Sequence, residues 1–546
     1  MTSSQSTILS SSSTIPTISI PQIAKADTSY DAVPYGSYPI PASHPDRLFG
    51  IGTLFGMKPV PPERARILEL GCAGGGNLMP IASQFPNASC IGIELSNLQS
   101  EDAKIALNFT GLKNIEIKHG SIADIKPELG QFDYIICHGV FSWVPEEVRE
   151  AILRVSSQNL SDNGIAYISY NTMPGWYLRG MVRDMMLRHV EGIKDTAAKT
   201  AQARALLGFL VKSTESHTSP YAAYLRAEAE FLDKQPDAYL FHDHLEEHNK
   251  AYFFQDFIRF ASQYGLQFLG ESTLSNMWTG NLSKETSQKL ESIQDGVLSG
   301  HYMDCIVGRS FRETLLVRSG IPITRHLDQS RFNNIRFLGS FKEEPVAEVL
   351  SAKSESRNKE YKTKTGHIIS APEGSSQLTI EALTNAFPGS LSLEQLSDAM
   401  QAGIPTHDKP SLPVDQNQLA ATLMQWVLSG FIDFRFQEDR LVVKGANKPM
   451  VSSWARSQAR ASRFVTNLRH EMISVSEVDR QIIPLLDGTR DIDSIASQIE
   501  TLIRSGILKT ESESMQVGKK ARELPLRVAR QLVEQYGKRA MLMPES

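Results

Sequence analysis

Cysteine is scarce in this sequence, with four among 546 residues. The separations between them match no metal-ligand pattern. We therefore expect reduced thiols, three of them buried in strands or in a glycine-rich turn. The four are Cys72, Cys90, Cys137 and Cys305.

Long apolar runs and an excess of basic charge are also missing. No run reaches the ~20 apolar residues that span a bilayer, so we expect no membrane insertion. Residues 1–29 are rich in Ser and Thr, have no Lys or Arg before Lys25 and no continuous apolar core, which predicts a disordered tail and no secretory signal. The net charge of −5 gives no general attraction to a nucleic-acid backbone. These absences favour a cytoplasmic protein without a nucleic-acid partner.

What the sequence does have is a glycine-rich turn between two regular segments, RILELGCAGGGN at residues 66–77. The apolar run Ile67 to Leu70 predicts a buried strand, and the segment Leu78 to Phe85 predicts a helix. Strand, glycine turn and helix form the first unit of a nucleotide-binding α/β sheet. Glycine suits the turn because the backbone must bend sharply and let a ligand approach.

The turn fits two binding patterns. Gly71-x-Ala73-x-x-Gly76 matches the dinucleotide fingerprint loosely. In another register, Glu69-x-Gly71-x-Ala73-x-Gly75 resembles motif I of class I S-adenosylmethionine (SAM) methyltransferases, with Ala73 in place of the middle glycine. The acid before the first glycine suits a cationic cofactor and would repel a pyrophosphate, which favours SAM.

The next two strands predict the nucleoside contacts. Ser89 to Leu95 reads as the second strand, and Glu94 at its tip is placed to accept from both ribose hydroxyls, about 20 residues beyond the glycines. After a third strand, the class I resemblance places the loop at residues 119–124 against the adenine. There the Ile122 N–H would meet a ring nitrogen, and Ser121 stands where many members carry an acid.

A later strand, Phe132 to Cys137, is followed by HGVFSWVP, a pattern that resembles methyltransferase motif IV. His138 begins this loop, and both a general base and a structural histidine remain open for it. The fifth strand, Ile165 to Tyr170, runs into YNTMPGWY.

Together these motifs resemble one bacterial group, the class I methyltransferases that carry a methyltransferase regulatory domain. The motifs are YDAVPYGSYPIPASHPDR, LELGCAGGGN, HGVFSWVP, YNTMPGW and FHDHLEEHNKAYFFQDF. The group includes protein-lysine methyltransferases that modify outer-membrane proteins. The resemblance implies SAM as cofactor and a protein acceptor, with an outer-membrane protein before export as one candidate.

The predicted fold class is α/β, a Rossmann-like seven-stranded class I methyltransferase sheet with a helical insertion, followed by winged-helix-like α+β domains. The domain bounds we predict are a tail at 1–29, a methyltransferase domain at 30–320 with a helical insertion at about 175–300, a winged-helix-like domain at 321–440 and a small, mainly helical domain at 441–546. The helix at residues 418–429 lacks basic residues, so we favour protein contact or dimerisation over DNA binding. A homodimer remains open.

The insertion ends near YLFHDHLEEH, which holds His242, His244 and His248. His244 and His248 have helical ligand spacing, but the order H-E-x-x-H is absent. We expect a polar cluster between domains and no metal.

The sequence thus predicts a SAM-dependent methyltransferase acting on protein lysines, with a small-molecule methyltransferase and a non-catalytic SAM-binding scaffold as alternatives. The strap at residues 30–47 is expected to cover the carboxyl ends of strands one and four. The predicted catalytic residues are Tyr35, His44, His138, Tyr170 and Trp176. The predicted cofactor-binding residues are Arg47, Glu69, Gly71, Ala73, Gly75, Asn77, Glu94, Leu95, Ser121, Ile122 and His138.

Overall fold

The computed structural model describes residues 36–325, 329–332, 334–344, 358–403, 415–507 and 519–544, together with positions 31, 33 and 327. The predicted tail at 1–29 and the predicted catalytic residue Tyr35 lie outside these residues. Among the helices that are described, none is long and apolar enough to cross a membrane.

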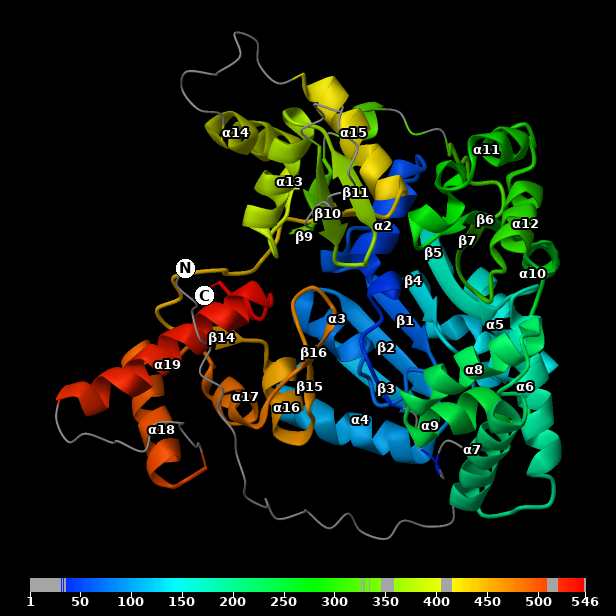
Figure 1. Cartoon of the computed structure of the whole chain (residues 1–546), viewed down its shortest axis with the longest axis horizontal. Coiled ribbons are helices and arrows are strands. Elements are labelled where there is room, and N and C mark those ends of the chain that lie inside the picture. The colour runs from blue at the N-terminus through cyan, green and yellow to red at the C-terminus, as the bar shows by residue number, and fades with distance from the viewer. Residues whose placement is uncertain are drawn as a thin grey trace.

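A seven-stranded sheet lies at the centre of the molecule (Figure 1), in the order β3-β2-β1-β4-β5-β7-β6. Strands β1 to β5 are parallel neighbours, whereas β7 pairs antiparallel with both β5 and β6. The predicted seven-stranded sheet is therefore confirmed. The strands are β1 (Arg66–Leu70), β2 (Ser89–Glu94), β3 (Ile115–His119), β4 (Phe132–Cys137), β5 (Leu160–Asn171), β6 (Leu266–Glu271) and β7 (Phe311–Arg318).

Helices cover both faces of this sheet, because successive strand residues point to opposite sides. Ile67 and Tyr134 pack with α2, α3 and α4 on one face, while Leu68 and Ile135 pack with α5 and α10 on the other. The helices are α2 (Pro45–Leu54), α3 (Leu78–Gln84), α4 (Asn97–Thr110), α5 (Glu146–Gln158), α10 (Phe254–Gln263), α11 (Lys284–Glu291) and α12 (Gly296–Val307).

The helical insertion has a core of its own and lies at one side of the sheet (Figure 1). It consists of α6 (Trp176–His189), α7 (Thr196–Ser213), α8 (Pro220–Asp233) and α9 (Asp237–Leu240), continued by a π-helical turn, η6 (Phe241–Leu245). The prediction of a mainly helical segment here is confirmed.

Two further regions follow the sheet. In the first, three helices accompany two small three-stranded sheets, ordered β12-β8-β13 and β11-β10-β9. Its elements are β8 (Arg336–Leu338), β9 (Phe341–Glu344), β10 (Lys359–Thr363), β11 (Ile368–Ala371), α13 (Ser375–Ala386), β12 (Leu391–Ser392), α14 (Leu393–Gly403), α15 (Gln416–Leu428) and β13 (Asp433–Arg435).

The second region closes the chain and packs around a separate apolar core. Within it, β15 and β16 form an antiparallel hairpin, and β14 pairs with β17. Its elements are β14 (Met450–Val451), α16 (Ser453–Ala461), β15 (Phe464–Thr466), β16 (Met472–Ser474), α17 (Glu477–Ile482), α18 (Ile492–Arg504), α19 (Lys519–Lys538) and β17 (Leu542–Met543).

The sheet and the region after it share one hydrophobic core. The cluster that holds Leu48 of α2 and Ile67 of β1 continues through Phe337 of β8 and Leu423 of α15. The predicted boundary near residue 320 is thus crossed by continuous packing, and the domain bounds stay a prediction.

Candidate active site

The glycine turn joins β1 to α3 at the carboxyl edge of the sheet. Gly71 has φ +73, and a Cβ there would meet the Val140 side chain. A Cβ on Gly76 would meet the backbone of Ser37, whose Oγ accepts a hydrogen bond from the Gly76 N–H at 2.6 Å. The turn therefore leaves no room for side chains at these positions. Ala73 has φ +47, a left-handed conformation that disfavours a residue with a Cβ.

Glu69 lies beneath this turn and is 4% exposed. Its Oε1 accepts from Asn77 Nδ2 at 2.8 Å, whereas its buried Oε2 accepts no hydrogen bond from any described residue. Burial raises the pKa of Glu69 to about 8, the Asn77 hydrogen bond opposes the shift, and Glu94 adds to it. A buried carboxyl with one open oxygen can accept a cationic donor.

Glu94, at the tip of β2, holds the turn in place. Its Oε2 accepts from the Ala73 N–H at 2.7 Å, and its Oε1 accepts from the Ser96 N–H at 2.8 Å. Burial raises its pKa, against these backbone hydrogen bonds. Each carboxylate oxygen has a second lone pair, so both can still accept from a ribose diol. Glu94 therefore also has a structural role, which the sequence did not indicate.

The residues predicted to face the adenine lie at the tips of β2 and β3, which are paired in parallel. Leu95 is half-exposed and Ile122 is buried. Ser121 begins a short 3-10 turn, and its Oγ accepts from the Ala123 N–H at 3.2 Å. The structure brings these residues to the same edge as Glu94, and contact of Ser121 and Ile122 with the adenine stays a prediction.

The described part of the strap lies on the glycine turn. Besides the Ser37 contact, the Ile40 N–H donates to Asn77 Oδ1 at 2.8 Å. His44 caps α2, and its Nε2 contacts Gln84 Oε1 at 2.7 Å. Burial, reinforced by Arg435, lowers the pKa of His44 to about 3, so its ring is neutral at pH 7.

Arg47, at the end of the strap, turns toward later parts of the chain. Its Nε donates to the Ser272 carbonyl at 2.7 Å, and its guanidinium pairs with Asp433 at 2.7 Å. Pairing of Arg47 with the SAM carboxylate stays a prediction, and it would have to compete with these contacts.

His138 follows β4 and begins a hydrogen-bonded chain that the sequence did not reveal. Its Nδ1 lies 2.8 Å from the Tyr167 hydroxyl, which donates to Glu313 Oε1 at 3.0 Å. Because the hydroxyl proton goes to Glu313, His138 Nδ1 must be the donor to Tyr167. Burial lowers the pKa of His138 to about 4. The ring is thus neutral, and Nε2 is left as an acceptor.

The other predicted catalytic residues lie elsewhere. Tyr170 is on the face of β5 opposite Tyr167, stacked on Phe257 at 3.8 Å and bonded to Thr314 Oγ1 at 3.1 Å. Trp176 is buried, and its Nε1 donates to Asn249 Oδ1 at 2.9 Å. The structure does not bring Tyr170 together with His138, and the roles of Tyr170 and Trp176 toward an ammonium stay predictions.

Comparison with known proteins assigns the family. The structure of PKMT2 from Rickettsia typhi superposes with a TM-score of 0.82 and 30% identity, covering 93% of this chain and 100% of that one. PKMT2 in complex with AdoHcy gives a TM-score of 0.81 at the same identity and coverage. An uncharacterized protein of Rickettsia prowazekii is 37% identical over 497 residues, 90% of this chain and 89% of its own length. The chain belongs to the PKMT-type class I methyltransferases.

Family profiles locate three parts of this methyltransferase. A methyltransferase domain matches residues 67–164, a predicted methyltransferase regulatory domain matches 236–318, and the PKMT C-terminal winged helix domain matches 447–536. The last range falls where the sequence predicted a small, mainly helical domain. The predictions of family, fold class and SAM as cofactor are confirmed.

The site residues fit SAM on structural grounds as well. SAM carries an ammonium and a sulfonium, and the open Oε2 of Glu69 is a buried acceptor at the carboxyl edge of the sheet. Glu94, at the tip of β2, is the acid predicted to accept from the ribose hydroxyls. Glu69, Asn77 and Glu94 are therefore the residues that would hold the cofactor of the methyltransferase.

The histidines near the end of the insertion are engaged with protein groups. His242 Nε2 contacts the Val33 carbonyl at 2.6 Å, and His244 Nε2 contacts Glu228 Oε1 at 3.3 Å. In the described part of the chain, no group of three or more His, Cys, Asp or Glu is placed to hold a metal ion.

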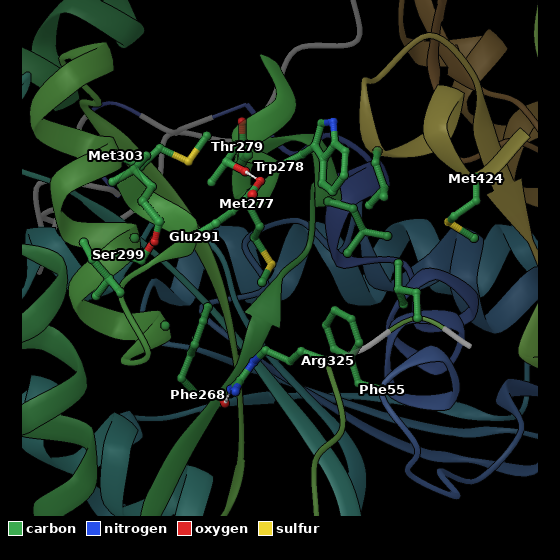
Figure 2. Close-up of a pocket in the computed structure, with 18 of the residues that line it drawn as sticks. Phe55, Phe268, Met277, Trp278, Thr279, Glu291, Ser299, Met303, Arg325 and Met424 are labelled. Atoms are coloured by element: carbon green, nitrogen blue, oxygen red, sulfur yellow. Dashed lines mark hydrogen bonds between the residues drawn. The ribbon is translucent and has the colours of Figure 1, made fainter. Parts of the chain in front are cut away.

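The methyltransferase also has a cavity of about 800 Å³ between the β6 edge and α15. Figure 2 shows Met303 and Met424 on opposite sides of it, with Phe268 and Arg325 along its floor. None of the residues predicted for the active site lines this cavity. It is therefore distinct from the edge that carries Glu69, Glu94 and His138.

Proposed function

We propose that this methyltransferase transfers methyl groups from SAM to lysine side chains of a protein. The observation that carries the proposal is the neutral His138 ring, with Nε2 as an acceptor, next to Phe311. The two rings lie 5.9 Å apart, edge to face, and Phe311 is 38% exposed. An exposed ring beside a neutral acceptor suits a long amine that enters from solvent. The PKMT designation of the structural neighbour supports the same acceptor.

Lysine must lose a proton before it can attack. With an ordinary pKa near 10.4, deprotonation at pH 7 costs about 4.6 kcal/mol. His138 is too weak a base to hold that proton, because its pKa is about 4. The proton therefore leaves to water, and Nε2 accepts a hydrogen bond from a remaining amine N–H, which aims the nitrogen lone pair.

When bound, SAM supplies the methyl group for an in-line transfer from sulfur to nitrogen. The residues of the chain then act by position. Tyr167 and Glu313 hold the His138 ring, Glu69 and Glu94 hold the cofactor, and Phe311 packs on the lysine stem or its ammonium. An outer-membrane protein met before export stays a prediction that rests on the family resemblance. Action in the cytoplasm and a homodimer stay predictions from the sequence alone.

The test is to incubate the protein with methyl-labelled SAM and a lysine-rich, unfolded acceptor protein. We expect methyl-lysine in the acid hydrolysate of the acceptor, found by mass spectrometry. A matched acceptor with acetylated lysines should take up no label. Label that appears only in small molecules of a lysate would instead indicate a small-molecule methyltransferase. Binding of SAM without transfer to any acceptor would indicate a scaffold.

A further inference from the structure

The hairpin β15–β16 of the C-terminal winged helix region reaches the cofactor turn with its tip, residues 467–471. His470 at this tip is 2% exposed, although it lies in the winged helix region. Its Nε2 is 2.7 Å from Asn77 Oδ1, and its ring centroid is 5.0 Å from that of His44. Beside it, the Leu468 carbonyl accepts from Gln84 Nε2 at 3.0 Å. The hairpin thus contacts the strap, the glycine turn and α3 together.

The tip is built to hold His470 in place. Asn467 Oδ1 accepts from the N–H groups of Arg469 and Glu471, each at 2.9 Å. His470 itself has φ +59, a conformation that residues other than glycine rarely adopt. Such a conformation persists only where the surroundings determine it, and it is found preferentially at functional sites. Here it directs the imidazole into the methyltransferase region.

Asn77 connects His470 to Glu69, the carboxyl group that we propose binds the cofactor. Its Oδ1 accepts from the Ile40 backbone N–H, and its Nδ2 donates to Glu69 Oε1 at 2.8 Å. Because a backbone N–H can only donate, Asn77 Oδ1 must face Ile40 and His470. His470 Nε2 must then carry the proton and donate to Asn77. The amide nitrogen is in this way fixed toward Glu69.

We propose that His470 is a positioning residue for SAM: by holding the Asn77 amide, it orients Glu69, so that full cofactor affinity requires the docked winged helix region. The inference rests on the cofactor and the family, and is independent of which acceptor receives the methyl group. It assigns a role in SAM binding to a residue that is 393 positions away from its partner in the chain.

The test measures SAM and AdoHcy binding by calorimetry on the full chain. His470→Leu introduces an apolar side chain of similar length that has no hydrogen-bond donor. It should weaken SAM binding about five- to tenfold, which is the effect of losing one buried hydrogen bond. His470→Gln places an amide donor at a similar reach and should restore most of the affinity. Met472→Leu, at an exposed position of the same hairpin, is the matched control and should bind as the wild type does.

A double-mutant cycle tests the route through Asn77. If His470 acts through this amide, Asn77→Ala combined with His470→Leu should bind SAM no more weakly than Asn77→Ala alone. The proposal is overturned if folded His470→Leu keeps wild-type affinity, if His470→Gln loses as much as His470→Leu, or if the two losses add. Thermal unfolding of each variant separates a lost fold from a lost contact. Because no acceptor is needed, failure of the lysine proposal would leave this test intact.

Discussion

The proposed cofactor half and the proposed acceptor half of the active site are built in different ways. Most residues of the cofactor half lie in one stretch, from Glu69 to Ile122, and adjacent parallel strands bring them together. The acceptor half joins three residues from separate elements: His138 directly after β4, Tyr167 in β5 and Glu313 in β7. The first half follows from local turn chemistry, whereas the second depends on an antiparallel pairing across a long insertion. Variants in the cofactor half should therefore change the affinity for SAM, and variants in the acceptor half should change turnover.

The largest effect is expected at Glu94. Glu94→Ala removes the acceptor of two backbone N–H groups as well as the predicted ribose contact, and charge-assisted hydrogen bonds contribute about 1.5–3 kcal/mol each. The dissociation constant of SAM, measured by calorimetry, should rise at least tenfold, and the melting temperature should fall. Glu94→Gln keeps one acceptor oxygen, so its dissociation constant for SAM should lie between those of the wild type and Glu94→Ala. Unchanged SAM affinity in a folded Glu94→Ala protein would reject the ribose assignment.

A second effect should appear in turnover alone. Tyr167→Phe removes the hydroxyl between His138 and Glu313 and frees the ring to rotate. We expect kcat to fall about tenfold, the value of one lost hydrogen bond, while the dissociation constant of SAM stays the same. Tyr134→Phe is the control, because it also loses a buried hydroxyl, one that donates to the Val60 carbonyl. Equal losses of kcat in both variants would mean that the effect is structural.

A third difference concerns protons in the cofactor half. The pKa of Glu69 is about 8 in the free protein, so the carboxyl is mostly protonated at pH 7. A bound cation favours the carboxylate and lowers this pKa, so SAM binding should release up to one proton at pH 7. Affinity should rise as the pH increases toward 8. Calorimetry in buffers of different ionisation enthalpy gives the number of protons released on SAM binding. The Glu69→Gln variant gives the number that the amine of SAM releases by itself. Equal proton release in that variant would contradict the assignment.

The smallest effect is expected at Ala73. Its left-handed backbone costs roughly 1 kcal/mol for a residue with a Cβ, and Gly removes this strain but adds entropy to the unfolded chain. Ala73→Gly should therefore raise the free energy of unfolding by less than about 1 kcal/mol. Denaturant titration measures it. A clear loss of stability would show that the Ala73 methyl group contributes packing that outweighs the strain.

The sequence predicted what is encoded locally. The strand, turn and helix around Gly71 and the acid at the tip of β2 follow from residue patterns over short distances. The contact of Tyr167 with Glu313 could not be predicted, because it depends on the register between β5 and β7 across an insertion. His470 and Asn77 are further apart still. The spacing of apolar residues predicts helices and strands. It does not predict a hydrogen bond between two distant regions when the way they pack together is unknown.

Tyr170 shows a second limit of prediction from sequence: the residue was singled out, but its direction was not known. It stands at the end of β5, where the predicted site lies, but a strand alternates its side chains between two faces. Tyr167 therefore reaches the His138 side, and Tyr170 packs against α10. The residue pattern of β5 predicted a role for Tyr170 because it did not show which face of the strand the site occupies.

The hydrophobic core that runs from α2 and β1 into α15 also has a consequence for the evolution of this chain. Modules that are shuffled between genes usually meet across polar, water-rich boundaries and keep their own interiors. Here the region after β7 completes the interior next to the sheet, so removing it would expose the face of α2 where Phe49 packs edge to face on Phe436. The sheet and the region after it therefore share an interior that a cut at their boundary would open. Recombination or truncation near residue 320 would therefore leave apolar side chains of α2 in contact with water.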